Sequence, residues 1–220
     1  MTISIHDHEL PDDTHNIYDV TFFDTKITTL VTTSPHFVNL WISETHQLNT
    51  PNNNNLNIVG LDVEWRPNQS RNIENPVAII QLCVGTRCLI FQILHCPNVP
   101  KSLKDFLSNK NYSFVGVGIE NDVEKLIDDY NLSVGKMVDV RLLASEVYGL
   151  KELKNSGIKD LSVRVLGKEI RKPKSVTMSR WDNEWLVPSQ VQYACVDAFL
   201  SYEIGRVLMN GGQNSSGGGL

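Results

Sequence analysis

The stretch Ile58-Val-Gly-Leu-Asp-Val-Glu-Trp65 decides which fold this chain can adopt. Its apolar composition predicts a core strand, and residues two apart in a strand face the same side. Asp62 and Glu64 therefore project together, while the residues beside them face the other layer. Two carboxylates side by side on a strand repel each other unless a cation bridges them. Taken alone, an Asp-x-Glu pattern is common and also fits an exposed strand face.

Two further segments of the chain end on a carboxylate. Phe114-Val-Gly-Val-Gly-Ile-Glu-Asn-Asp122 is a strand-like run leading to an acid at the start of a helix, where a plain N-cap is the structural alternative. In Tyr193-Ala-Cys-Val-Asp197 the first and last residues share one helical face, and a surface Tyr–Asp pair is the alternative. Buried carboxylates are costly without a compensating cation, and hard oxygen ligands suit Mg²⁺ and Mn²⁺. These acids therefore predict a divalent metal site if the fold brings them together.

In combination, these segments match the three exonuclease motifs of the DEDD superfamily in order. The residues around them resemble the Werner syndrome exonuclease and RNase D branch, and most resemble the stand-alone, helicase-less Werner-like exonucleases of plants. The resemblance spans roughly residues 56–210, and its further motifs are Ala78-Ile-Ile-Gln-Leu-Cys83, Leu166-Gly-Lys-Glu169, Ser179-Arg-Trp-Asp182 and Gln192-Tyr-Ala-Cys-Val-Asp-Ala198. Position 192 is Gln where a histidine subclass would carry His, so Tyr193 indicates the tyrosine (DEDDy) subclass.

The resemblance implies an α/β fold: an RNase H-like (DnaQ-like) mixed five-stranded sheet flanked by helices, with its second strand antiparallel. It implies catalytic roles for Asp62, Glu64, Asp122, Tyr193 and Asp197, with the four acids holding two Mg²⁺ or Mn²⁺ ions. The implied activity is that of a metal-dependent 3′–5′ exonuclease, which releases nucleoside 5′-monophosphates from the 3′ end of single-stranded or frayed DNA or RNA by a two-metal mechanism. The alternative is a catalytically weak nucleic-acid-binding or scaffold module with the same fold, which a missing ligand would have favoured. No Gly-x-Ser-x-Gly or paired Cys/His arrangement supports a metal-independent hydrolase.

Strand-like and helix-like segments follow one another along the chain. Two strands are predicted on either side of Asp24-Thr-Lys26, followed by strands at 58–65, 77–84, 88–93, 114–119 and 137–140. Helices are predicted at 35–46, 102–107, 121–130, 141–148, 157–167 and 188–209. This order is typical of an α/β sheet with helices on its faces. The expected parts are a flexible N-terminus at 1–16, an N-terminal extension with an Asn-rich loop at 17–56, the exonuclease domain at 57–210, and a disordered tail at 211–220.

Size and composition describe an ordinary globular domain. The 220 residues, 41% of them hydrophobic, suffice for one well-buried core. No run of about 18 apolar residues appears, so we expect no membrane association. The first residues lack the pattern of a secretory signal, so we expect an intracellular location in the nucleus or the cytoplasm. The four cysteines form no Cys-x-x-Cys pair. We therefore expect reduced thiols rather than a zinc site.

Charge is distributed unevenly along the chain. The net charge of −5 argues against coating of duplex nucleic acid by bulk electrostatics, yet residues 151–180 carry nine Lys or Arg and three acids, a local +6 that leaves −11 elsewhere. Such a segment suits capture of a phosphate backbone, with a solvated helical face as the alternative. The predicted nucleic-acid-binding residues are Trp65, Lys168, Arg171, Lys172 and Lys174, and a core role for Trp65 is equally well supported. Trp181 and Trp185 are further candidates for base stacking, with core packing preferred for Trp181. The expected partners are single-stranded 3′ ends, with a homo-oligomer or a loading partner supplying processivity.

Overall fold

A computed structural model describes residues 3–11, 13–48, 57–68, 70 and 74–214 of the chain. The strands are β1 (Ile3–His8), β2 (Asn16–Phe22), β3 (Thr25–Thr32), β4 (Ile58–Trp65), β5 (Val77–Val84), β6 (Arg87–Phe91), β7 (Ser113–Gly116) and β8 (Met137–Asp139). The helices are α1 (Pro35–Leu48), α2 (Lys101–Ser108), α3 (Ile119–Tyr130), α4 (Val140–Tyr148), α5 (Ile158–Leu161), α6 (Lys174–Thr177) and α7 (Pro188–Asn214). Short 3₁₀ or π turns lie at Ile93–His95, Lys151–Asn155 and Ser162–Leu166.

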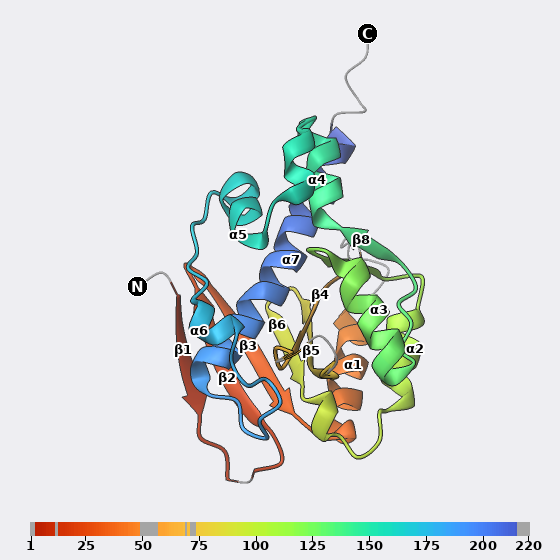
Figure 1. Ribbon diagram of the computed structural model, residues 1–220, viewed down its shortest axis with the longest axis vertical. Helices are drawn as coiled ribbons and strands as arrows, with labels where there is room; N and C mark the ends of the chain where they lie inside the picture. The colour runs from red at the N-terminus through yellow and green to blue at the C-terminus, as the bar shows by residue number, and fades with distance from the viewer. Residues whose placement is uncertain (1–2, 12, 49–56, 69, 71–73, 215–220) are drawn as a thin grey trace.

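All of these strands belong to one mixed sheet, which runs in the order β1-β2-β3-β6-β5-β4-β7-β8 (Figure 1). The central strand β5 pairs antiparallel with both β4 and β6, while β7 and β8 continue from β4 in parallel. The five strands predicted from residue 58 onward are therefore confirmed, as is the antiparallel second strand. Almost every side chain of β5 is buried, which explains its continuous apolar run.

The N-terminal segment corrects one prediction. Residues 1–16 were expected to be flexible, but Ile3–His8 form β1, which pairs antiparallel with β2. Alternating Ile3 and Ile5 pack against the core while the polar residues between them face outward, a pattern too short to stand out in the sequence. Because β3 pairs in parallel with β6, the three N-terminal strands enlarge the expected five-stranded sheet to eight strands.

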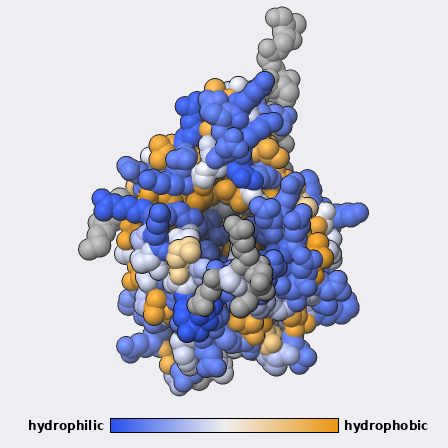
Figure 2. Space-filling view, in the orientation of Figure 1, coloured by the Kyte–Doolittle hydropathy of each residue, from blue (hydrophilic) through white to orange (hydrophobic). Residues whose placement is uncertain are grey.

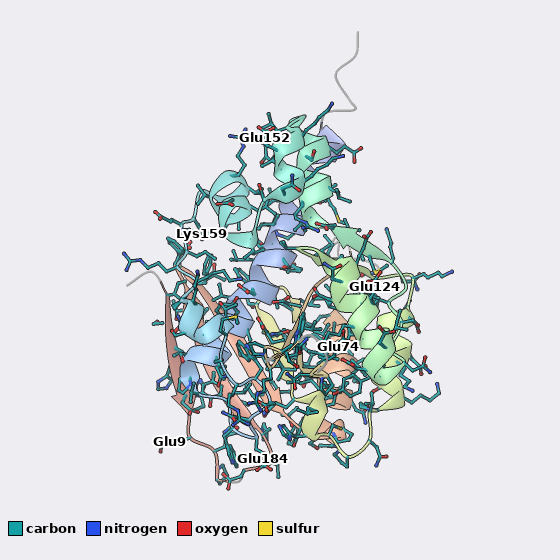
Figure 3. All side chains as sticks on the ribbon, viewed as in Figure 1. Glu9, Glu74, Glu124, Glu152, Lys159 and Glu184 are labelled. Atoms are coloured by element: carbon teal, nitrogen blue, oxygen red, sulfur yellow. The ribbon has the colours of Figure 1, made fainter. Side chains whose placement is uncertain are left out.

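Helices cover both faces of the sheet and create two separate cores. One core lies between the sheet and α7, with α4 and α5 beside it, and contains Ile79, Trp181 and Phe199. The other lies beneath α1, α2 and α3 and contains Trp41, Leu82 and Phe106. Charged side chains such as Glu9, Glu152 and Glu184 lie around the outside (Figure 3). The space-filling view shows apolar residues beneath α4 and α5 and a hollow near the centre of the same face (Figure 2).

Helix α3 begins earlier than the sequence pattern predicted. The helix was expected at 121–130 with Asp122 as a candidate N-cap, but it starts at Ile119 and the N-cap is Gly118, at φ 71°. Left-handed backbone of this kind suits glycine, and a Cβ there would lie 3.2 Å from Nη2 of Arg141. Asp122 therefore lies in the first turn of the helix rather than at its cap.

Helix α7 also exceeds its predicted length, because it continues through residues 211–214 to Asn214. The rest of the expected disordered tail, residues 215–220, lies outside the described residues, as do positions 49–56 of the Asn-rich loop. Among the described residues, no helix is long and apolar enough to cross a membrane.

Candidate active site

The site forms where α7 crosses β4. The crossing point on the strand is Gly60, where a Cβ would lie 2.0 Å from the carbonyl oxygen of Ala198 and 2.8 Å from the backbone nitrogen of Tyr202. Only glycine permits backbones to approach this closely. On this face of β4 the residues after Gly60 are Asp62 and Glu64, so the contact brings Asp197 of α7 next to them.

Three of the predicted carboxylates converge at this crossing. Asp62, Glu64 and Asp197 each offer an oxygen, and these atoms all lie within 4.8 Å of one another. Asp197 is only 5% exposed, and the other two side chains are half-buried. Segments more than 130 residues apart in the chain thus supply one compact acidic cluster. We call Asp62, Glu64 and Asp197 the carboxylate cluster.

Burial and mutual repulsion disfavour ionisation of the carboxylate cluster. Desolvation, reinforced by Asp197, raises the pKa of Glu64 to about 8. Desolvation and the charges of Asp122, Asp197 and Glu64 hold the pKa of Asp62 well above its ordinary value. Desolvation also raises the pKa of Asp197, although Lys172 opposes that shift. A cation placed among these oxygens would offset both the cost of their burial and the repulsion that acts on Asp62 and Glu64.

Gln81 gives an independent sign that a hydrated cation fits here. It lies directly opposite Asp62 across the β4–β5 pair and is fully buried. Within the part of the chain that the structure describes, neither its Oε1 nor its Nε2 has a hydrogen-bond partner. Buried amides are normally paired, and the water shell of a divalent ion held by the cluster would supply partners. The residues present therefore fit the Mg²⁺ or Mn²⁺ site that the sequence predicts.

Lys172 supplies the cluster with a positive charge from the chain itself. Its Nζ lies 2.5 Å from Oδ2 of Asp197 and 4.7 Å from the centroid of the Tyr193 ring. Burial alone would lower the pKa of Lys172, but the attraction and hydrogen bond of Asp197 outweigh burial and raise it. The sequence pattern predicted Lys172 as a nucleic-acid-binding residue, and nothing in its spacing indicated a contact with Asp197.

Tyr193 lies one turn before Asp197 on α7. Its ring tilts against that of the fully buried Trp181, with centroids 5.8 Å apart, and its hydroxyl accepts a hydrogen bond from Thr177 at 3.4 Å. Burial and the charge of Asp197 raise the pKa of Tyr193 to about 12. The core role preferred for Trp181 is confirmed, and that role includes support of the Tyr193 ring.

Asp122 lies near the cluster without belonging to its closest set of oxygens. It is buried, and its charge raises the pKa of Asp62. Desolvation and the charge of Asp139 raise the pKa of Asp122 to about 7, against a lowering by Arg141. Arg141 and Asp139 form an ion pair of 2.6 Å beside it. This pair was not among the residues predicted from the sequence. The end of β8 was the available signal, because parallel neighbours such as β7 and β8 end on the same edge of a sheet.

The other predicted nucleic-acid-binding residues occupy different places. Trp65 packs against the core beneath α3 with Nζ of Lys125 5.3 Å from its ring centroid, which supports its core role. Lys168 pairs with Asp24 at 3.0 Å. Arg171 and Lys174 are exposed on the segment that leads past the cluster into α6. Their contacts with nucleic acid remain predictions.

Comparison with known proteins identifies the family of the chain. A family model described as 3′–5′ exonuclease matches residues 41–212, a region that contains the predicted domain at 57–210 and begins earlier, within α1. The chain belongs to the 3′–5′ exonuclease family. Its match to the bifunctional 3′–5′ exonuclease/ATP-dependent helicase WRN of Mus musculus is 36% identical and covers 72% of this chain but 11% of that protein. Its match to a 3′–5′ exonuclease of Arabidopsis thaliana is 34% identical and covers 68% of this chain and 52% of that protein. The exonuclease chain thus spans about half or less of the length of these relatives.

Solved structures show the same exonuclease fold. Escherichia coli RNase D superposes with a TM-score of 0.70 at 17% identity, covering 84% of this chain and 45% of that one. The EXO domain of Aedes aegypti Nibbler gives a TM-score of 0.68 at 18% identity, covering 84% of this chain and 88% of that one. These likenesses confirm the RNase H-like architecture of the mixed sheet.

Proposed function

We propose that this exonuclease domain hydrolyses the last phosphodiester bond at the 3′ end of a single-stranded or frayed DNA or RNA strand. The oxygen of a water molecule bonds to phosphorus, and the bond from phosphorus to the 3′-oxygen of the preceding nucleotide breaks. That 3′-oxygen takes up a proton, and a nucleoside 5′-monophosphate leaves. The observation that carries the proposal is the convergence of Asp62, Glu64 and Asp197 within 4.8 Å.

The proposed cofactors are two Mg²⁺ or Mn²⁺ ions. The carboxylate cluster would hold one ion, and Asp62 together with the nearby Asp122 would hold the second. When bound, such ions neutralise charge on the reacting phosphate and lower the pKa of the attacking water. The buried, mutually repelling acids and the unpaired amide of Gln81 support this assignment.

Tyr193 would position the attacking water. Because burial and Asp197 hold its pKa at about 12, the phenol stays protonated near neutral pH. A protonated hydroxyl both donates and accepts hydrogen bonds, so it suits the orientation of a water molecule rather than removal of its proton. Trp181, tilted against the ring, and Thr177, which donates to the hydroxyl, limit its movement.

Single-stranded or frayed ends are the proposed substrate because the site is recessed. With Asp197 only 5% exposed, a terminal nucleotide must leave a duplex to reach the cluster. Arg171 and Lys174 are exposed on the segment beside the site and would attract the strand's phosphates. Processivity would come from self-association or from a loading partner.

Strand shortening tests the proposed hydrolysis directly. A 5′-labelled single-stranded RNA, the matched DNA and a recessed duplex are incubated with the chain and Mg²⁺ or Mn²⁺. We expect stepwise shortening from the 3′ end, release of nucleoside 5′-monophosphates, and complete inhibition by a chelator. Comparison of the RNA and DNA arms identifies the preferred polymer. Binding without any shortening would instead identify a nucleic-acid-binding module.

Asp62→Ala and Asp197→Ala separate catalysis from folding. Each variant should lose activity by orders of magnitude, because each removes a metal ligand. Asp62→Ala should melt at least as high as the parent in chelator, because removal of one carboxylate relieves repulsion in the cluster. Asp197→Ala also removes the partner of Lys172, so it should melt a few degrees lower. A large fall of the melting temperature in both variants would show that these acids are structural.

A further inference from the structure

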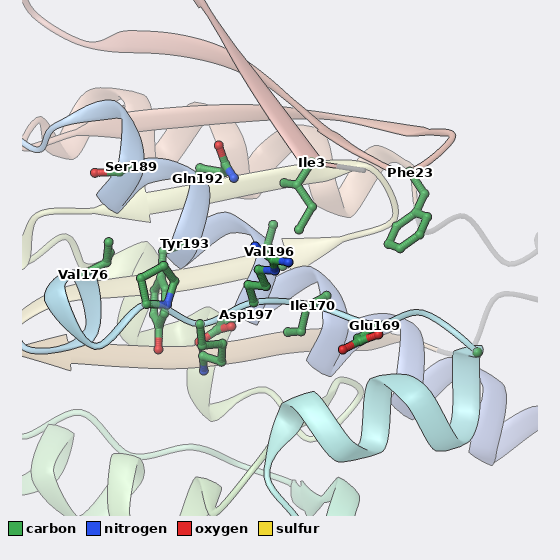
Figure 4. A pocket seen from close by; sticks show the side chains of 14 residues that line it. Ile3, Phe23, Glu169, Ile170, Val176, Ser189, Gln192, Tyr193, Val196 and Asp197 are labelled. Carbon is green, nitrogen blue, oxygen red and sulfur yellow. The ribbon is translucent and has the colours of Figure 1, made fainter. Parts of the chain in front are cut away.

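A pocket of about 670 Å³ lies directly beside the carboxylate cluster (Figure 4). It shares Lys172, Tyr193 and Asp197 with the site and extends along α7 past Gln192 and Val196. In the close-up, Tyr193 and Asp197 lie on the α7 side of this space and Ile3 and Phe23 on the side of the N-terminal strands. Pockets that bind small ligands have volumes of roughly 300–1,000 Å³. The space is therefore large enough for a nucleotide.

One wall of the pocket comes from a part of the chain outside the family match. Ile3 of β1 and Phe23 of the β2–β3 turn line it, whereas the matched region begins at residue 41. Both side chains are half-buried against the core that α7 covers. The N-terminal strands thus add to the site a surface that lies outside the residues matched by the family model.

The β2–β3 turn holds Phe23 in an unusual conformation. Its φ is 56°, in the left-handed region that non-glycine residues rarely adopt, and bulky residues adopt least. Two contacts of Lys168 stabilise the turn. Its Nζ pairs with Asp24 at 3.0 Å and lies 5.0 Å from the centroid of the Phe23 ring. Strained conformations persist where surrounding contacts enforce them, and they concentrate at functional sites.

The lining of the pocket combines the groups that recognise a nucleotide. Phe23, Ile3 and Val196 are apolar, and Phe23 adds an aromatic face on which a base would stack. Arg171 lines the same space, is exposed, and forms no ion pair with any residue that the structure describes. Ser189 and Gln192 add hydrogen-bonding groups. An apolar peptide would leave the guanidinium of Arg171 unused, whereas a phosphate would pair with it.

We propose that this pocket binds one nucleotide of the substrate strand, next to the phosphodiester that is cleaved. The base lies against Phe23 and the phosphate lies near Arg171. Because the pocket shares Asp197 with the carboxylate cluster and also contains Tyr193, the nucleotide that fills it adjoins the cleaved bond. This inference rests on the proposed function, and it assigns the N-terminal strands a part in substrate binding.

Binding of strands with one missing base tests the site. The full chain carrying Asp62→Asn, which should not shorten the strand, is titrated in chelator with 5′-labelled oligonucleotides that each contain one abasic position, counted from the 3′ end. We expect removal of the base at one position to weaken binding by about 5- to 150-fold, the range that base–aromatic stacking supplies. Phe23→Asn should weaken binding of the intact strand by a similar factor. When the base is missing at that one position, the protein that retains Phe23 and the Phe23→Asn variant should bind the strand with equal affinity. When the base is missing at any other position, the Phe23→Asn variant should bind more weakly.

Several variants distinguish weaker binding caused by loss of the pocket contact from weaker binding caused by misfolding. Asn and Gly tolerate left-handed backbone, so Phe23→Asn and Phe23→Gly should fold and should show the same loss. Phe23→Tyr, which keeps the ring, should bind like the parent. Tyr148→Ala removes an aromatic side chain of α4 that is 39% exposed and does not line this pocket, so it should have no position-specific effect. Arg171→Gln should weaken binding of every strand without changing the melting temperature.

Free nucleoside 5′-monophosphate forms the second arm of the test. Suppose that Phe23→Asn weakens binding of the free nucleotide, while the effect of a missing base on strand binding is the same at every position. The pocket then holds the released product, and its assignment to the substrate strand is wrong. Equal binding of all strands by parent and Phe23→Asn would also overturn the proposal. Because binding is measured without turnover, a chain that binds in this position-specific way but shortens no strand would refute the hydrolysis and not the pocket.

Discussion

At the scale of single residues, the charge of the candidate site depends on three carboxylates and on one ammonium group that partly neutralises them. Asp62, Glu64 and Asp197 are close enough to share a cation, and Lys172 contacts Asp197. The positive charge of Lys172 lowers the pKa of Asp62 and Glu64, against the larger effect of burial. A divalent ion and this lysine therefore compete for the same oxygens.

Lys172→Met should change stability and metal affinity in opposite directions. In chelator the melting temperature should fall by a few degrees, because the carboxylates lose their partner and the pair is only partly exposed. The affinity for Mn²⁺ measured by calorimetry should rise, because the ion no longer displaces an ammonium. Lys174→Met is the matched control, since Lys174 is exposed outside the cluster. Equal Mn²⁺ affinity in both variants would show that Lys172 does not compete with the ion for the carboxylate oxygens.

The metal-free protein should become less stable as pH rises between about 4.5 and 8. Burial raises the pKa of Glu64 from 4.5 to about 8, so the folded state favours the protonated acid. The stabilisation is complete below the unfolded-state pKa and disappears as pH rises through the folded-state pKa. Melting temperatures across this pH range in chelator measure the effect, and Glu64→Gln should flatten the slope. An unchanged slope in Glu64→Gln would assign the pH dependence to other groups.

At the scale of elements, the site depends on one close crossing. Helix α7 lies against β4 at Gly60, and the missing side chain there lets Asp197 approach Asp62 and Glu64. The crossing is supported along the helix, where Gly205 faces Val115 of β7 with a Cβ position only 3.0 Å from its methyl groups. The spacing of the acids in each element was readable from the sequence, but their distance from one another follows from this packing.

Gly60→Ala should damage the fold and the site together. The new methyl group would lie 2.0 Å from the carbonyl oxygen of Ala198, so α7 must move away from β4. We expect a clear fall of the melting temperature and weaker Mn²⁺ binding, because the carboxylates separate. Gly157→Ala is the control: φ is −81° there and nothing lies within 4 Å of the added Cβ, so its melting temperature should stay close to the parent's. Normal Mn²⁺ binding by Gly60→Ala would show that the crossing does not set the site.

At the scale of the whole molecule, the N-terminal strands and the exonuclease region form one continuous sheet. The parallel pairing of β3 with β6 joins them (Figure 1). Phe23 of the β2–β3 turn lines the pocket beside α7. The molecule carries a net charge of −5, yet the segment 151–180 carries +6 and passes the carboxylate cluster at Lys172. Capture of a strand should therefore depend on a few local cations rather than on overall charge.

The salt dependence of binding should report these local cations. For single strands, each phosphate contact contributes about −0.7 to the slope of log affinity against log salt. Arg171→Gln and Lys174→Gln should each make the slope shallower by up to about that amount. Lys159→Gln tests the same change of charge at an exposed position outside the pocket lining, and should leave the slope unchanged. Fluorescence titrations at several salt concentrations measure these slopes, and identical slopes in all three variants would refute local capture.

The sequence alone determined the nature of the site and much of the fold. Apolar periodicity located the strands from Ile58 onward, because burial of one or both strand faces leaves a direct trace in residue order. The Asp-x-Glu and Tyr-x-x-x-Asp spacings determined which side chains share a face within one element. Family resemblance supplied the link between the motifs, and the family match confirms it.

Only the tertiary structure decided which of these groups meet. The start of α3 at Ile119, the pairing of β1, the contact of Lys172 with Asp197 and the pocket wall at Phe23 depend on partners distant in the chain. No local pattern encodes such contacts, because they arise when packed elements bring backbones together, as Gly60 and Ala198 do. Residue order thus determined the chemistry available, and the packing of α7 on the sheet decided where that chemistry is assembled.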